Sequence, residues 1–139
     1  MLPATLDLWR DASMGRAVNV YGRTSYSDKT SMDIVRQGWV EQRKTDPRVR
    51  LGDFRACDVF DRMAAIQNIA VPTLVVCGAD DVVTPPKYAQ YLSAQIPGAQ
   101  LAMIPDAGHA SYAEQPEALS QALTAFLDRL SPTSPVTGG

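Results

Sequence analysis

The stretch that most constrains the fold is an apolar segment, residues 73–77, which ends in Gly78. Its sequence, Thr-Leu-Val-Val-Cys, has no polar alternation after the threonine, which predicts a short strand buried on both faces. A second apolar segment, residues 100–104, follows a helical stretch that begins with a Thr84-Pro85 start signal and stops at Pro97-Gly98. Strand, helix and strand in this order predict two parallel strands joined by a crossover helix.

The rest of the chain predicts helices. Residues 1–26 have the spacing of a loose helix, a second helix is predicted at about 29–43, and 48–52 reads as a connector. Residues 53–66 predict one or two short helical turns, the last capped by Asp61, and a final helix starts at 115–117 with a regular apolar stripe up to Leu130. Residues 131–139 have the composition of a disordered tail. Two parallel strands cannot form a sheet buried on both faces, so we expect part of the sheet to be missing from this chain.

Composition excludes several classes of protein. The 139 residues suit one domain, and 13 basic and 15 acidic residues without a basic run argue against nucleic acid or an anionic membrane surface as a partner. The longest nearly apolar run, residues 69–79, contains a proline and is too short to span a bilayer. Residues 1–20 lack the apolar core of a secretory signal, and two unpatterned cysteines predict reduced thiols in a cytoplasmic protein.

Ionisable side chains follow both predicted strands. Asp80 and Asp81 come after the first strand, and His109, the only histidine, follows the second strand and Gly108. Because adjacent parallel strands end at the same edge of a sheet, we expect a carboxylate and an imidazole to meet there. Such a pair is two-thirds of a hydrolytic triad, in which the carboxylate orients the histidine that acts as the base.

These segments, in this order and spacing, resemble the C-terminal end of an α/β-hydrolase-fold protein, within the enol-lactonase, esterase and haloperoxidase-like group. The residues that carry the resemblance are 69–81, 84–85, 96–99, 107–109, 114–116 and 126–127. The resemblance implies a partial α/β fold, with a helical cap (lid) over residues 1–66 followed by a β-α-β-α core portion over 67–130. It covers residues 53–130 well and is weaker over 1–52.

The resemblance also implies a catalytic arrangement. It maps Asp81, rather than Asp80, onto the triad acid and His109 onto the base, with no metal or organic cofactor. The family's nucleophile is a serine on a G-x-S-x-G elbow upstream of the cap. The present sequence contains no G-x-S-x-G. We therefore expect the chain to be the C-terminal part of a serine-type hydrolase of esters or lactones, inactive by itself.

No residue of the chain replaces the missing serine convincingly. Ser13 lies in Ala-Ser-Met-Gly, but Asp11 stands where the elbow needs a glycine and a helix-like segment precedes it, so an exposed helical serine is predicted. Cys57 and Cys77 are weaker candidates still, and Cys77, at the end of a buried strand, is expected in the core.

Other polar and aromatic residues have open or structural interpretations. Asp106 is predicted to be a solvated loop residue, and Glu114 a carboxylate favoured by the dipole at a helix N-terminus. Met32, Trp39 and Phe60 either line a substrate pocket under the cap or only pack the cap.

Two functions other than ester or lactone hydrolysis remain. One is a non-catalytic half-fold that pairs its exposed strand edge with a partner or with a second copy. The other is cofactor-free peroxidation or C–C bond cleavage on the same scaffold, which would use the same Asp–His pair.

Overall fold

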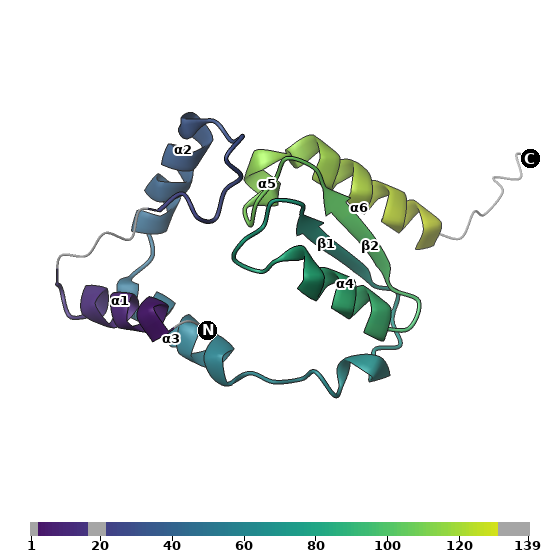
Figure 1. The fold of residues 1–139 in the computed structure, drawn as a ribbon, viewed down its shortest axis with the longest axis horizontal. Coiled ribbons are helices and arrows are strands. Elements are labelled where there is room, and N and C mark those ends of the chain that lie inside the picture. Colours follow the sequence, from purple (N-terminus) through teal and green to yellow (C-terminus); the bar gives the residue numbers. More distant parts are fainter. Residues whose placement is uncertain (1–2, 17–21, 131–139) are drawn as a thin grey trace, which may run out of the picture.

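The computed structural model describes residues 3–16 and 22–130. Its elements are α1 (Pro3–Ser13), α2 (Met32–Arg43), α3 (Pro47–Val59), a short 3₁₀ turn η1 (Ile66–Asn68), β1 (Leu74–Gly78), α4 (Pro86–Gln95), β2 (Gln100–Ile104), α5 (Ser111–Glu114) and α6 (Pro116–Leu130). The predicted tail, 131–139, and residues 17–21 of the predicted first helix lie outside the described residues. Figure 1 shows α1 and α3 set apart from an α/β unit that contains both strands, with α2 nearer to α5.

The α/β unit confirms the predicted order of strand, helix, strand and helix. β1 and β2 pair in parallel, with Leu74 opposite Gln100 and Gly78 opposite Ile104. Both α4 and α6 contact both strands, and they lie on opposite sides of the sheet (Figure 1). This arrangement requires the long connection through α4, because parallel strands cannot be joined by a hairpin.

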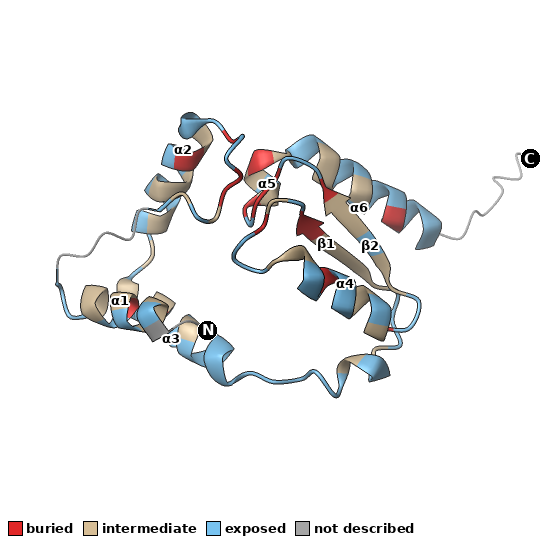
Figure 2. Ribbon diagram, in the orientation of Figure 1, coloured by how far each residue is buried: buried red, intermediate tan, exposed pale blue. Residues whose placement is uncertain are grey.

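The outer edge of β1 is unpaired within the described part of the chain. The Ala79 N–H donates to the Ile104 carbonyl, and the Gln100 N–H donates to the Thr73 carbonyl, each at 2.9 Å. In a parallel strand the backbone groups of alternate residues point to the same side. Since Thr73 and Ala79 bond to the β2 side, Leu74 and Val76 turn their backbone groups toward the open edge. Burial on both faces is therefore incomplete: in β1 only Cys77 and Gly78 are buried (Figure 2). The prediction of a fully buried strand was wrong for Leu74 to Val76 in this chain.

The helices α1 and α3 form a separate packed pair. Trp9 of α1 stacks on Phe54 of α3 with ring centroids 6.0 Å apart, and the Arg50 guanidinium lies 5.2 Å from the Trp9 centroid. The predicted connector at 48–52 was wrong, because it lies inside α3. Pro47 ends the preceding segment and also begins this helix, where its missing N–H costs nothing, and the Asp46 side chain caps the Arg48 amide at 2.8 Å.

Two further predictions were wrong, one about a helix start and one about the burial of a helix face. Asp61 accepts a hydrogen bond from the Met63 amide in a turn, and no α-helix follows it before β1. On α6, Phe126 is buried as the apolar stripe predicts, but Leu123, Leu127 and Leu130 are between 42% and 56% exposed. The stripe is wider than the two strands can cover.

A turn segment joins the helical part to the α/β unit. We call residues 23–30 the strap. Arg23 organises it by donating to the backbone carbonyls of Ser27, Asp28 and Thr30 at 2.7–2.9 Å. Tyr26, buried in the strap, forms a small core with Val35 of α2 and Ala110 beside α5. The strap thereby brings α2 against the loop that carries His109.

Candidate functional site

Asp81 is held in a tight turn immediately after β1. The Asp81 N–H donates to the Gly78 carbonyl at 3.2 Å, and Asp81 Oδ1 accepts from the amides of Val83 and Thr84 at 2.8 and 2.9 Å. Such local bonding is the usual way in which an aspartate stabilises a turn. Thr84, predicted as the cap of α4, instead donates its hydroxyl to Asp81 Oδ2 at 2.9 Å, and Pro85 occupies the cap position. The side chain of Asp81 is consequently 5% exposed and has one orientation.

His109 meets this carboxylate across the ends of the two strands. Its Nδ1 lies 2.9 Å from Asp81 Oδ2 and 3.2 Å from the Thr84 hydroxyl oxygen. An ionised carboxylate only accepts, so the ring proton is on Nδ1 and the lone pair is on Nε2. The side chain of His109 is 45% exposed, which leaves the ring accessible from outside.

Burial and hydrogen bonding oppose each other at Asp81. Burial alone would raise the pKa of the carboxyl group. The hydrogen bond from His109, followed by those from the Thr84 amide and hydroxyl and from the Val83 amide, outweighs burial and holds the pKa below its ordinary 3.8. The acid is therefore ionised and available to orient the imidazole at neutral pH.

The neighbouring carboxylates have different partners. Asp80 accepts from the Ser27 hydroxyl at 2.6 Å and lies 3.9 Å from the Lys29 ammonium group. Asp106 is exposed, as predicted, and pairs with Lys29. Of the three aspartates considered from the sequence, the structure brings only Asp81 to His109.

A cavity of about 310 Å³ lies beside this pair. It follows the open side of β1, so Val75, Val76 and Cys77 line one part, and Tyr88 and Leu92 of α4 line another. Asp81 and His109 lie in its wall. The wall of the cavity combines apolar side chains with the polar residues Asp81, Thr84, His109 and Ser111.

The three residues that could have lined a substrate pocket, Met32, Trp39 and Phe60, do not line this cavity. Trp39 packs against the Tyr26–Val35–Ala110 core and donates its indole N–H to the Gly22 carbonyl at 3.2 Å. Phe60 is 70% exposed, and Met32 is 37% exposed and contacts Arg23 through its sulfur. For Trp39 the packing interpretation is the one the structure shows.

The nucleophile candidates occupy structural positions. Ser13 ends α1 and donates its hydroxyl to the Arg10 carbonyl at 2.7 Å, and α1 packs on α3, far from the strands in Figure 1. Cys77 is buried, as predicted, and Cys57 is exposed on α3. Among the described residues, no group of three or more His, Cys, Asp or Glu side chains is arranged to hold a metal ion.

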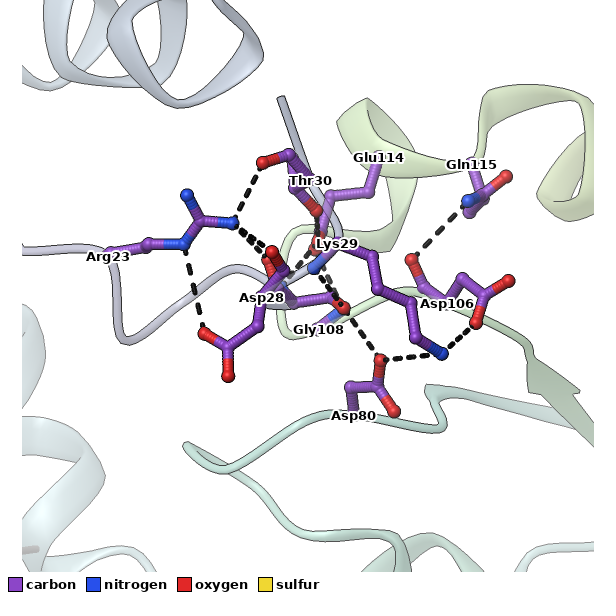
Figure 3. Close-up of polar contacts among 10 residues, drawn as sticks. Arg23, Asp28, Lys29, Thr30, Asp80, Asp106, Gly108, Glu114 and Gln115 are labelled. Carbon is purple, nitrogen blue, oxygen red and sulfur yellow. Dashed lines mark hydrogen bonds and ion pairs between the residues drawn. The ribbon is translucent and has the colours of Figure 1, made fainter. Parts of the chain in front are cut away.

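Glu114 was misjudged from the sequence. It was expected to be a carboxylate at a helix N-terminus, but it is 8% exposed and lies at the end of the four-residue helix α5. Figure 3 shows its carboxylate between the strap and the loop before His109. No periodic pattern in the sequence signals this role, because two of the three donors to Glu114, the Ser27 amide and the Thr30 hydroxyl, are more than 80 positions away.

The sequence of this chain matches the profile of a known protein family. The profile described as the alpha/beta hydrolase family matches residues 2–122, most of the chain. The chain belongs to the alpha/beta hydrolase family. The segment from β1 to α6, with an aspartate after one strand and a histidine after the next, is thus a portion of the alpha/beta hydrolase fold.

Individual members of the alpha/beta hydrolase family are similar to parts of this chain. A Mycobacterium tuberculosis protein named non-heme bromoperoxidase BpoC is 44% identical over 108 residues, which cover 73% of this chain and 41% of BpoC. The crystal structure of BpoC superposes with a TM-score of 0.72 at 26% identity, covering 94% of this chain and 55% of BpoC. An enol-lactonase from Burkholderia xenovorans is 30% identical with a TM-score of 0.58, covering 60% of this chain and 32% of the enzyme. The chain spans about two fifths of the length of the first curated relative, 41% of it.

Proposed function

We propose that this chain supplies the acid and the base of a serine-type hydrolase that acts on small ester or lactone substrates. The observation that carries the proposal is the 2.9 Å contact between His109 Nδ1 and Asp81 Oδ2 at the ends of adjacent parallel strands. The depressed pKa of Asp81 and the exposed imidazole of His109 suit an acid that orients and a base that transfers protons.

In the proposed reaction, a serine hydroxyl attacks the carbonyl carbon of the substrate. His109 Nε2 takes the hydroxyl proton and later returns it to the leaving alcohol, while Asp81 keeps the other ring nitrogen protonated. Water then attacks the carbonyl carbon of the acyl-serine while His109 takes a proton from the water. His109 returns this proton to the serine oxygen as the acyl–oxygen bond breaks, which releases the acid product. The serine belongs to sequence outside these 139 residues, because they contain no G-x-S-x-G elbow.

Residues 1–66 act as the cap in this proposal, and residues 67–130 as the C-terminal part of the core. The separation of α1 and α3 from the α/β unit supports this division (Figure 1), and α2 meets the unit through the small core of Tyr26, Val35 and Ala110. The unpaired edge of β1 and the exposed leucines of α6 support a sheet completed by further strands. The coverage of only 41% of BpoC supports the same interpretation.

An activity assay tests this proposal directly. Purified residues 1–139 are expected to hydrolyse p-nitrophenyl acetate no faster than the His109→Ala variant. Rapid turnover that His109→Ala abolishes would show that the chain holds its own nucleophile. Sequencing the coding DNA upstream of Met1 is the complementary test: an in-frame strand followed by G-x-S-x-G is expected, and a stop codon there would contradict the proposal.

The relation to BpoC favours cofactor-free peroxidation as a second candidate. This reaction would use the same Asp81–His109 pair, so the geometry of the pair does not separate it from hydrolysis. An intact enzyme that oxidises halide with peroxide but leaves esters and lactones unchanged would select this candidate.

A further inference from the structure

We propose that Glu114 is a positioning residue for His109, which it holds in register with Asp81 by tying the His109 loop to the strap. The inference rests on the proposed role of His109 as the base, and it adds a residue that acts through His109 without contacting substrate. It is carried by hydrogen bonds, burial and close backbone packing around one carboxylate.

The carboxylate of Glu114 accepts hydrogen bonds from two separate segments of the chain. Its Oε1 accepts from the Gly108 amide at 2.9 Å, immediately before His109. Its Oε2 accepts from the Ser27 amide of the strap at 2.7 Å and also from the Thr30 hydroxyl. The three donors account for both oxygens, so the ionised group joins the loop and the strap (Figure 3).

The backbone on the other side of His109 is tethered to the same strap. The Ala110 N–H donates to the Ser25 carbonyl at 3.0 Å. The amides on both sides of His109 are therefore held to the strap. The Ala110 amide bonds to it directly, and the Gly108 amide is joined to it through Glu114. Since the ring contacts Asp81 through one nitrogen, a shift of this backbone would lengthen the Nδ1–Oδ2 distance.

Close packing explains why the loop depends on the strap. A Cβ atom at Gly108 would lie 2.7 Å from the Ser27 nitrogen and 2.8 Å from the Tyr26 carbonyl carbon. Real Cβ atoms do not approach backbone so closely, so the two segments are in direct backbone contact. Lys29 adds ion pairs from the strap to Asp80, which follows β1, and to Asp106, which follows β2 (Figure 3).

Glu114→Gln is the sharpest test of this role. Glutamine keeps the shape but has one acceptor oxygen, so in either orientation of the amide at least one of the Gly108 and Ser27 N–H groups faces a donor. Glu117→Gln is the matched control, because Glu117 is an exposed residue in the first turn of α6. Both variants are made in the full chain of 139 residues. They are compared by structural readouts, so the result does not depend on catalytic turnover.

Two readouts are measured by NMR spectroscopy. The first is amide hydrogen exchange at Ser27 and Gly108, where Glu114→Gln is expected to accelerate exchange by about tenfold or more, given the strength of hydrogen bonds to charged groups. The second is the Nδ1–H signal of His109, which belongs to the chain's one histidine. We expect this signal to weaken or to show a mixture of ring tautomers, while the amides of α6 keep their protection and Glu117→Gln resembles the wild type.

Three outcomes would overturn the proposal. They are unchanged exchange and an unchanged Nδ1–H signal in Glu114→Gln, an equal effect of Glu117→Gln, and uniform loss of protection across α6 without a selective change near His109. If Glu114→Gln fails to fold, Thr30→Val serves instead, since it removes one of the two donors to Glu114 Oε2 and leaves that oxygen less firmly held against the Ser27 amide. It should accelerate exchange at Ser27 severalfold, and wild-type exchange there would contradict the proposal. If the intact enzyme hydrolyses neither esters nor lactones while Glu114→Gln still changes the exchange rates and the Nδ1–H signal, the proposed function is refuted but the positioning role stands.

Discussion

Gly78 lies where the end of β1 is in close contact with residues 107–108 of the loop before His109. A Cβ atom there would overlap the carbonyl oxygens of Gly108 and Ala107, at distances that no real contact shows. The obstacle is backbone that the Glu114 bonds hold in place, so it cannot move aside cheaply. Gly78 therefore allows β1 and the His109 loop to approach one another.

We predict that Gly78→Ala lowers the free energy of unfolding by about 2–4 kcal/mol, in the range of severe steric changes in packed regions. Urea unfolding followed by circular dichroism measures it. Gly52→Ala is the matched control, because a Cβ atom at Gly52 in α3 would meet nothing within 4 Å. Alanine favours helices, so the control should stabilise by about 0.5–1 kcal/mol. Equal effects of the two substitutions would contradict the steric account.

The Asp81 carboxylate predicts a pH-dependent contribution to stability. Its pKa is below the ordinary 3.8 in the folded state, so its ionised form favours folding. That contribution is fully present above about pH 5, where the unfolded-state carboxyl group is also ionised, and it is lost as the pH falls through the folded-state value. The difference in unfolding free energy between wild type and Asp81→Asn is therefore expected to shrink between about pH 5 and about pH 2. A constant difference across this interval would argue against it. Asp53→Asn, on the exposed side of α3, is the control.

The two cysteines lie in elements of contrasting exposure. Burial, and then the charge of Asp81, raise the pKa of the Cys77 thiol, whereas Cys57 is exposed on α3. We expect a thiol reagent such as DTNB to label one cysteine rapidly in the native protein and the second only after denaturation. In the Cys57→Ser variant the fast phase should disappear. A fast phase that survives in Cys57→Ser would show that β1 opens readily.

The elements that were predictable from sequence are those with an uninterrupted local pattern. Residues 100–104 form β2 as predicted, and α6 begins at Pro116, within the expected start at 115–117. The start of α3 was missed because Pro47 can both end one segment and begin a helix, and the sequence around it favours neither alternative. Residues 23–30 lie where the first predicted helix gives way to the second, and nothing local in them reveals that they dock on residues 108–114.

The candidate site likewise has one part that the sequence predicts and one part that it does not. The meeting of Asp81 with His109 follows from strand order and the parallel ladder, so it was predictable from the ends of two apolar segments. The choice of Asp81 over Asp80 came from the resemblance, and the geometry agrees with it. Glu114 was not predictable, since its partners are set by the docking of a distant segment.

At the scale of the whole molecule, the described part contains no helix long and apolar enough to cross a membrane. The feature that dominates this scale is the open edge of β1, where Leu74 and Val76 present unpaired backbone groups. Open edges tend to pair with other chains. We therefore predict concentration-dependent self-association of the isolated chain in sedimentation velocity experiments.

Proline substitutions distinguish edge pairing from other contacts. Val76→Pro removes an N–H group that faces the open edge, so it should weaken association while the fold is retained. Val75→Pro removes an N–H group that faces β2 and should cost about 3 kcal/mol or more of stability. Monomeric behaviour of the wild type at all concentrations would refute edge pairing, and so would association unaffected by Val76→Pro.

The strap closes the chain into a ring, because residues 23–30 dock on the α/β unit that the chain reaches only later, through residues 59–65 (Figure 1). Residues 59–65 are exposed and include Arg62, a site for trypsin. Cleavage there should leave two pieces that still co-elute in gel filtration, joined by the contacts of Ser27 and Lys29. The strap would thus act as a non-covalent latch that keeps a nicked molecule in one piece.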